Sequence, residues 1–372
     1  MVDSMHELYL RYNSVSVFGS TAAAIAPLAE LITAHDMPSR VRNAAAVFRA
    51  VADSNCDSTG EWIKKLVISD DNPFSRAVAM GERVSPKIKA QVMSELTTFK
   101  QLSLVSPREF AGDASEFFPQ FGFGGFSVSY DSLVKTYAQN GCGLFGEAAT
   151  FVYHGGEFIS AVNRNERLSD LKGYAEEKYE IESNTHSFSV GCPAFHTLLI
   201  GERGTGKSAT VRAVAREQSG MVKLIELPDV SELADLVKKI SGLKQKFIIF
   251  IDALDMREWE KNRTATDRVL DAPVSNYLVY CTVDRDKGCG EASDSELMLF
   301  DRFGLVVTYL SPDKDEFSDI LKQILRSRSI KWRDEYGSIA ELAARKKGGR
   351  SPRAAKQIAD LIECTYAQKR CD

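Results

Sequence analysis

The sequence lacks the signals of secretion and of membrane insertion. No uninterrupted apolar run approaches the roughly 20 residues that a membrane-spanning helix requires. The first residues, Met1 to Leu8, combine neither a basic start nor an apolar core, which argues against a secretory signal. We therefore expect a cytoplasmic protein with no membrane partner.

Cysteine pairs and an excess of charge are also missing. The seven cysteines are scattered, form no Cys-x-x-Cys pair and have no histidine at ligand spacing, which predicts reduced thiols rather than a disulfide framework. The formal net charge is −4, so the chain gives no general nucleic-acid signal. Of the 372 residues, 44% are hydrophobic and 26% are charged, which is typical of a soluble globular protein. The length is sufficient for two or three domains.

The residue composition and the spacing of apolar residues change along the chain. Helical spacing of apolar residues predicts helices at 20–35, 41–51 and 85–104. An aromatic and glycine-rich stretch follows, which favours a packed linker of short strands and turns. Strands then alternate with helices, which indicates an α/β fold with a parallel sheet covered on both faces. We expect four regions: an N-terminal helical region at 1–106, a linking region at 107–165, an α/β nucleotide-binding core at 166–311 and a C-terminal helical lid at 312–372.

The most informative stretch is Gly-Glu-Arg-Gly-Thr-Gly-Lys-Ser at 201–208. A buried strand is predicted before it and a helix after it, as a phosphate-binding loop requires. Glycines let the backbone N–H groups turn toward phosphate oxygens; Lys207 would reach the β- and γ-phosphates, and Ser208 would bind Mg²⁺. A glycine-rich turn with a surface lysine is the simpler alternative. The predicted nucleotide contacts are Gly201, Glu202, Arg203, Gly204, Thr205, Gly206, Lys207, Ser208 and Ala209.

Two further predicted strands end in carboxylates. Asp252 closes a continuous apolar strand and is the expected second protein ligand of Mg²⁺, unless it merely caps the next helix. Asp284 closes the strand that begins at 277, where it or Thr282 would contact the γ-phosphate or orient the attacking water. These positions are consistent with a ligand crevice at the carboxyl edge of the sheet.

Two arginines complete the candidate site. Arg302 lies just before the last strand, where it would point into the nucleotide of a neighbouring subunit and neutralise charge in the transition state. An ion pair with Asp301 or another surface carboxylate is the alternative explanation. Arg353 follows a capping Ser351 and a first-turn Pro352, so it is a candidate lid arginine within a basic run that is otherwise typical of a solvated loop.

Together these motifs resemble the AAA+ ATPases, and within them the bacterial family catalogued as domain of unknown function 815. The resemblance rests on the segments 171–178, 198–208, 247–252, 301–304 and 349–353, and on 72–76 in the N-terminal region. It implies ATP and Mg²⁺ as cofactors, Gly173 and Tyr174 beside the adenine, Arg302 as an arginine finger and Arg353 as a second sensor. It implies no substrate.

The sequence departs from the AAA+ pattern at two positions. Ala253 follows Asp252 where these enzymes usually carry the acidic residue that polarises water, and Asp255 is a candidate substitute. Asp284 stands where an asparagine is common, and its carboxylate would repel a γ-phosphate unless a cation lay between them.

These observations support two functions. The first is a slow ATPase that remodels an unidentified protein or other macromolecule, as a homo-oligomeric ring or dimer. The alternative is a nucleotide-gated protein-binding module with little or no hydrolysis, which Ala253 favours. A small-molecule kinase fits less well, because no acceptor site is visible.

Overall fold

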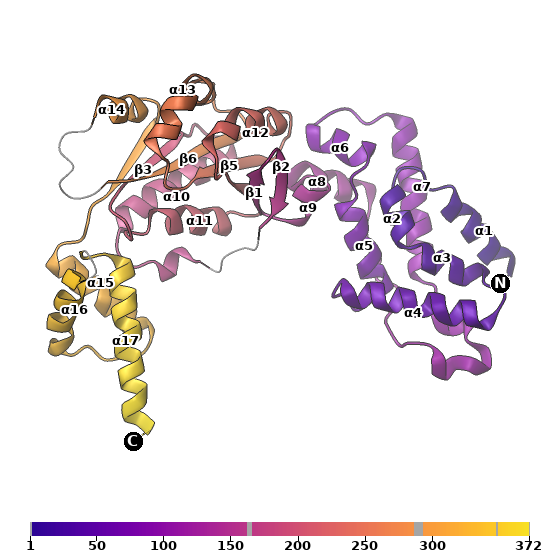
Figure 1. Ribbon diagram of the computed structural model, residues 1–372. Helices are drawn as coiled ribbons and strands as arrows, with labels where there is room; N and C mark the ends of the chain where they lie inside the picture. The colour runs from indigo at the N-terminus through magenta and orange to yellow at the C-terminus, as the bar shows by residue number, and fades with distance from the viewer. Residues whose placement is uncertain (1, 162–165, 286–292, 347–348, 372) are drawn as a thin grey trace. The chain divides into compact units, whose positions relative to one another are not determined.

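The computed structural model describes residues 2–161, 166–285, 293–346 and 349–371 (Figure 1). Cys289 and part of the basic run before Arg353 lie outside these residues. The chain forms two compact units. The first unit comprises 1–148 with 243–245, and the second comprises 149–242 with 246–372. The predicted linking region at 107–165 is thus divided between them.

The regular elements among the described residues of the first unit are helices. Its helices are α1 (Val2–Asn13), α2 (Gly19–Ala24), α3 (Ala26–Thr33), α4 (Met37–Asp53), α5 (Thr59–Ser69), α6 (Pro73–Met80), α7 (Pro86–Ser103), α8 (Tyr130–Asn140) and α9 (Leu144–Glu147), with 3-10 turns η1 (Pro107–Phe110) and η2 (Gly112–Phe117). Fully buried aromatic side chains form the centre of its core: Phe18, Phe74, Phe99 and Tyr137. Ser85 caps α7 through the Ile88 N–H, and α7 lies within the helix predicted at 85–104.

Two elements of the first unit differ from the sequence-based expectation. The helix predicted at 20–35 is divided into α2 and α3, because Pro27 in the first turn of α3 cannot donate the hydrogen bond that would continue α2. The linking region contains the helix α8 in addition to turns. A reciprocal capping box between Ser129 and Ser132 starts α8, and Leu133 and Tyr137 bury one face of it.

The second unit is built on one seven-stranded sheet. Its strands are β1 (Thr150–His154), β2 (Glu157–Ser160), β3 (Thr197–Gly201), β4 (Val222–Glu226), β5 (Lys246–Ile251), β6 (Tyr277–Asp284) and β7 (Leu305–Tyr309). Their order is β2-β1-β4-β5-β6-β3-β7, with only β2 antiparallel to its neighbour. The strands β1 and β2 come from the predicted linking region, and the buried Phe151 and Tyr153 anchor β1 beside β4.

Helices cover both faces of this sheet, so the predicted α/β fold class is confirmed. The helices α10 (Ala175–Val190) and α11 (Lys207–Glu217) lie on one face, and α12 (Leu233–Ile240) and α13 (Met256–Leu270) lie on the other (Figure 1). The helix α14 (Asp294–Phe300) precedes β7, and the 3-10 turns η3 (Leu168–Asp170) and η4 (Val230–Glu232) precede α10 and α12.

After β7 the second unit ends in a helical lid. Its helices are α15 (Lys314–Ser327), α16 (Asp334–Lys346) and α17 (Pro352–Cys371), which enclose a separate apolar core. Ser351 accepts a hydrogen bond from the Ala354 N–H and so starts α17 as the sequence predicted. None of the described helices has the length and apolar character that crossing a membrane requires.

Candidate nucleotide-binding site

The phosphate loop connects the end of β3 to the start of α11. Gly201 has φ +152°, and a Cβ at this position would lie 2.1 Å from the carbonyl oxygen of Tyr309, so β7 leaves no room for a side chain. Gly204 has φ +85°, and its carbonyl oxygen accepts a hydrogen bond of 3.2 Å from the Arg353 N–H in the lid. The glycines therefore allow the loop to curl between the sheet and the lid.

A cavity of about 980 Å³ opens along this loop and is lined by the loop, the segment before α10 and the lid. Of the predicted loop contacts, residues 203–209 line it, whereas Gly201 and Glu202 do not. The described lining includes eight cationic side chains and four carboxylates, in a chain whose formal net charge is −4. The cavity is therefore suited to a polyanion.

Lys207 is the most enclosed charge at the loop. Its side chain is only 4% exposed, and its Nζ donates to the carbonyl oxygens of Gly201 at 2.6 Å and Glu202 at 2.9 Å, and to Oδ1 of Asp284 at 3.0 Å. Oδ2 of Asp284 accepts from Nε of Arg203 at 3.0 Å. The structure thus brings the end of β6 against the phosphate loop.

Asp252 lies at the end of β5, opposite the start of α11. Its Oδ1 accepts from Oγ of Ser208 at 2.5 Å and from Oγ1 of Thr282 at 2.8 Å, and its Oδ2 accepts from Arg212 at 3.0 Å. Partial burial opposes ionisation of Asp252, but the Ser208 and Thr282 hydrogen bonds and the Arg212 charge outweigh it and lower the pKa of the carboxyl. Asp252 is therefore held as an anion beside Ser208.

Arg212 is a site residue that the sequence reasoning missed. Its guanidinium also donates to Glu226 at 2.6 Å and lies 5.1 Å from the centre of the Phe250 ring, so it connects the ends of β4 and β5. The available signal was its position four residues after Ser208, which places both side chains on one face of α11.

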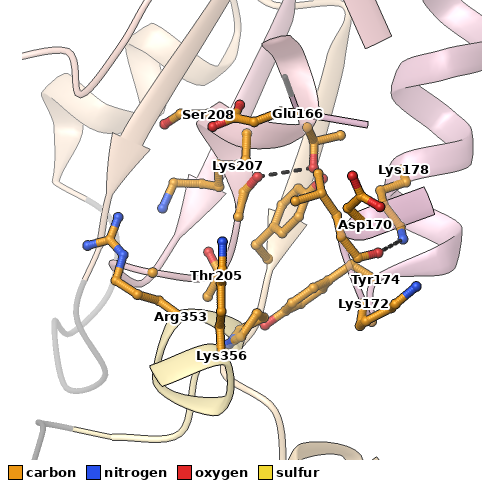
Figure 2. A pocket seen from close by; sticks show the side chains of 18 of the residues that line it. Glu166, Asp170, Lys172, Tyr174, Lys178, Thr205, Lys207, Ser208, Arg353 and Lys356 are labelled. Carbon is orange, nitrogen blue, oxygen red and sulfur yellow. Dashed lines mark hydrogen bonds between the residues drawn. The ribbon is translucent and has the colours of Figure 1, made fainter. Parts of the chain in front are cut away.

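The segment before α10 forms another wall of the cavity. Tyr174 has φ +53°, and its hydroxyl donates to the Leu310 carbonyl at 2.6 Å while its ring lies 4.9 Å from that of Tyr309. A Cβ at Gly173 would lie 2.9 Å from Ile320 of α15, so this segment packs closely on the lid. Arg353 and Lys356 extend from α17 at the lid side of the cavity (Figure 2).

Two of the candidate catalytic residues lie apart from the cavity. Asp255 is the N-cap of α13 and accepts from the Arg257 N–H at 2.9 Å. Arg302 forms ion pairs with Asp271 at 2.8 Å and with Asp267 at 3.3 Å. Neither of these carboxylates lines the cavity. Neither residue is among those that line the cavity.

Ala253 lines the cavity but brings no polar side-chain group to it. It has φ +53°, an unusual conformation for a residue with a Cβ, and its N–H donates to Oγ1 of Thr282 at 2.7 Å. Thr282 thus connects the backbone of Ala253 to the carboxylate of Asp252.

The donor set fits Mg²⁺ bound together with phosphates. Among the described residues no group of three or more His, Cys, Asp or Glu side chains could hold a metal alone. The adjacent oxygens of Ser208 and Asp252 match the few protein ligands that Mg²⁺ takes when phosphates and waters supply the rest.

The strand order with β3 between β6 and β7, the phosphate loop after β3 and the helical lid after β7 define an AAA+ P-loop ATPase fold. The chain belongs to the family described as "Protein of unknown function (DUF815)", whose model matches residues 147–287 and 282–366. The resemblance predicted from the sequence is thereby confirmed for these residues, and the segment 72–76 lies outside them.

Curated relatives are more distant. The Holliday junction branch migration complex subunit RuvB of Clostridium kluyveri is 27% identical over 175 residues, 44% of this chain and 49% of the relative. The protein of that name from Prochlorococcus marinus is 25% identical over 190 residues, 47% of this chain and 52% of the relative. The chain therefore spans about half the length of the curated relatives it matches.

Solved structures show a limited likeness. The RuvB Holliday junction branch migration motor of Thermotoga maritima is 17% identical with a TM-score of 0.42, covering 56% of this chain and 67% of that chain. PCH-2 of C. elegans is 17% identical with a TM-score of 0.38, covering 52% of this chain and 63% of that chain. The fold class follows from the strand order and the loop.

Proposed function

We propose that this chain binds ATP with Mg²⁺ in the cavity, hydrolyses it slowly, and uses the cycle to remodel an unidentified macromolecular partner. The observation that carries the proposal is that Lys207 and Ser208 at the start of α11 contact Asp284 and Asp252, which lie at the ends of β6 and β5. The excess of cationic groups around the cavity supports a polyphosphate ligand.

Each residue has a proposed task. Lys207 and the loop amides hold the phosphates, Ser208 and Asp252 hold Mg²⁺, and Arg353 reaches from the lid. Bound Mg²⁺ would supply charge neutralisation on the phosphate oxygens. Gly173 and Tyr174 form the wall assigned to the adenine.

Slow hydrolysis is proposed because Ala253 offers no carboxylate to orient water. Asp255 and Asp284 are the two candidates for this task. Of the two, Asp284 lines the cavity and Asp255 caps α13, so we assign the task to Asp284.

Arg302 acts as a finger only if another copy of the chain is adjacent. Its pairs with Asp267 and Asp271 hold the guanidinium in place at the surface of the second unit. The curated relatives are by name subunits of a complex, which supports an assembly of this chain with other chains. Light scattering with a slowly hydrolysed ATP analogue tests this, and a strict monomer would assign Arg302 an intramolecular role.

Nucleotide binding and phosphate release test the main proposal. The wild type should bind Mg-ATP and release phosphate slowly, whereas Lys207→Ala should lose both. Lys238→Ala, an exposed lysine on α12, is the matched control and should behave as the wild type. Equal phosphate release from the wild type and Lys207→Ala would contradict the proposal.

The alternative function is a nucleotide-gated binding module, which the absence of a carboxylate at Ala253 favours. In that case ATP would remain intact for hours while it raised the unfolding temperature. Turnover within minutes would exclude this alternative.

A further inference from the structure

We propose that Asp284 competes with the terminal phosphate of the nucleotide for Lys207, and that Arg203 offsets this competition. The two residues thereby set how strongly the site prefers a nucleoside triphosphate over a diphosphate. This inference rests on the proposed nucleotide binding and concerns selectivity, which is separate from the role of Asp284 in hydrolysis.

The first step concerns the hydrogen bonds of Lys207. A lysine ammonium has three N–H donors, and the structure gives Nζ three acceptors: two loop carbonyls and Asp284. A phosphate oxygen that contacts Nζ must therefore replace one of them. The carbonyls of Gly201 and Glu202 belong to the loop backbone, so the side chain of Asp284 is the partner that can be exchanged.

The second step concerns the position of Asp284. It is the last residue of β6 and pairs in register with Gly201, the last residue of β3. The strand pairing therefore fixes its backbone beside the phosphate loop. Its carboxylate is 33% exposed while Lys207 is 4% exposed, so this anion stands at the boundary between the enclosed ammonium and the cavity.

The third step concerns Arg203. It pairs with the other carboxylate oxygen of Asp284 but is 80% exposed, so the pair alone contributes little to stability. When a phosphate takes Lys207, Arg203 is the cation left beside Asp284. Its charge then reduces the repulsion between the carboxylate and the phosphate.

The competition weakens binding of a triphosphate more than binding of a diphosphate. A triphosphate brings an additional phosphate and additional negative charge toward Lys207 and Asp284. Asp252, another acid beside the loop, is held by Ser208, Thr282 and Arg212. Asp284 is thus the carboxylate that pairs with both cationic side chains of the loop, Arg203 and Lys207.

The test compares four chains: the wild type, Asp284→Asn, Arg203→Gln and the double variant. Dissociation constants are measured by calorimetry for Mg-ADP and for a β,γ-imido analogue of ATP, which avoids hydrolysis. Asp284→Asn should tighten binding of the analogue about tenfold, which is about 1.4 kcal/mol, and change ADP binding much less. Arg203→Gln should weaken binding of the analogue severalfold when Asp284 is present and much less when it is combined with Asp284→Asn.

Asp170→Asn is the matched control, because Asp170 is a carboxylate that also lines the cavity. Within the described residues, Arg203 and Lys207 both form their ion pairs with Asp284 and not with Asp170. It should leave the ratio of the two affinities unchanged. ADP binding reports that each variant is folded. An unchanged affinity ratio in Asp284→Asn, or additive effects in the double variant, would overturn the inference while leaving nucleotide binding intact. Failure of the wild type to bind either nucleotide would instead overturn the proposed function on which the inference rests.

Discussion

Glu95 in the first unit and Lys207 in the second are both buried charges, but their partners differ. In the first unit Glu95 is 2% exposed, and its carboxylate accepts from the backbone N–H groups of Ser16, Val17 and Phe18. In the second unit Lys207 is similarly enclosed, but one of its partners is the side chain of Asp284 beside an open cavity.

This difference separates a structural charge from a binding charge. The partners of Glu95 are mainly backbone groups of one loop, so exchanging them would require local unfolding. The Asp284 partner of Lys207 can move aside for an anion without breaking the sheet. Burial of a charge therefore does not identify a site by itself, whereas burial beside a cavity with an exchangeable partner does.

The largest effect is expected from Gly201→Ala, because the new Cβ would lie 2.1 Å from the Tyr309 carbonyl and push β7 away from β3. We expect the second unit to lose more than about 4 kcal/mol of stability, with nucleotide binding lost. Chemical denaturation measures this. Gly220→Ala is the control, because its Cβ would meet nothing within 4 Å. Equal stability of both variants would contradict the expected packing.

Removing the structural charge should act on the first unit instead. Glu95→Ala leaves three backbone N–H groups without their acceptor and should cost about 4 kcal/mol in the free energy of unfolding. Glu95→Gln keeps one acceptor oxygen and should cost less. Nucleotide affinity should be unchanged in whatever fraction remains folded. A loss of nucleotide affinity with an unchanged free energy of unfolding would contradict the assignment of Glu95 as a structural charge.

A third prediction concerns the pH dependence of the second unit. Burial lowers the pKa of His196 from 6.5 to about 4, and its Nδ1 accepts from the Val279 N–H. The unfolded chain therefore binds the proton more readily than the folded chain between these pH values. This residue's contribution is full above pH 6.5 and falls by about 3 kcal/mol as the pH drops to 4.

His196→Asn tests this contribution, because an amide oxygen can accept the same Val279 N–H but does not titrate in that range. Denaturation at several pH values should give a shallower decline for the variant than for the wild type. Parallel declines would show that His196 does not titrate as its burial implies.

The smallest effect is expected from Arg212→Ala, which removes the cation that holds Oδ2 of Asp252. Nucleotide affinity in the presence of Mg²⁺ should fall about tenfold, and affinity with a chelator present should change less. Arg212→Lys should recover part of the loss, because it keeps the charge but not the two-carboxylate geometry. An equal loss with and without Mg²⁺ would assign Arg212 to the nucleotide rather than to the metal ligand.

The sequence was sufficient where the structure depends on local patterns. The strands β3, β5 and β6 are present where the sequence predicts a strand before the phosphate loop, a strand before Asp252 and a strand from residue 277, because their apolar runs are contiguous. Ser351 is predicted as a cap for the same reason.

Sequence reasoning was insufficient where a contact joins distant segments. The pairing of Arg203 with Asp284 spans 81 positions, and that of Arg212 with Asp252 spans 40. Their partners are set by strand order and register, which no local pattern encodes. The same holds for β1, whose place beside β4 depends on a sheet edge formed later in the chain.

Hydrogen exchange with and without a β,γ-imido analogue of ATP and Mg²⁺ tests the central claim most directly. If the nucleotide binds in the cavity, its addition should slow exchange of the amides at 203–209 and around the start of α17 in the wild type, and should leave exchange unchanged in Lys207→Ala. Equal exchange of these amides with and without the nucleotide in the wild type would contradict the account.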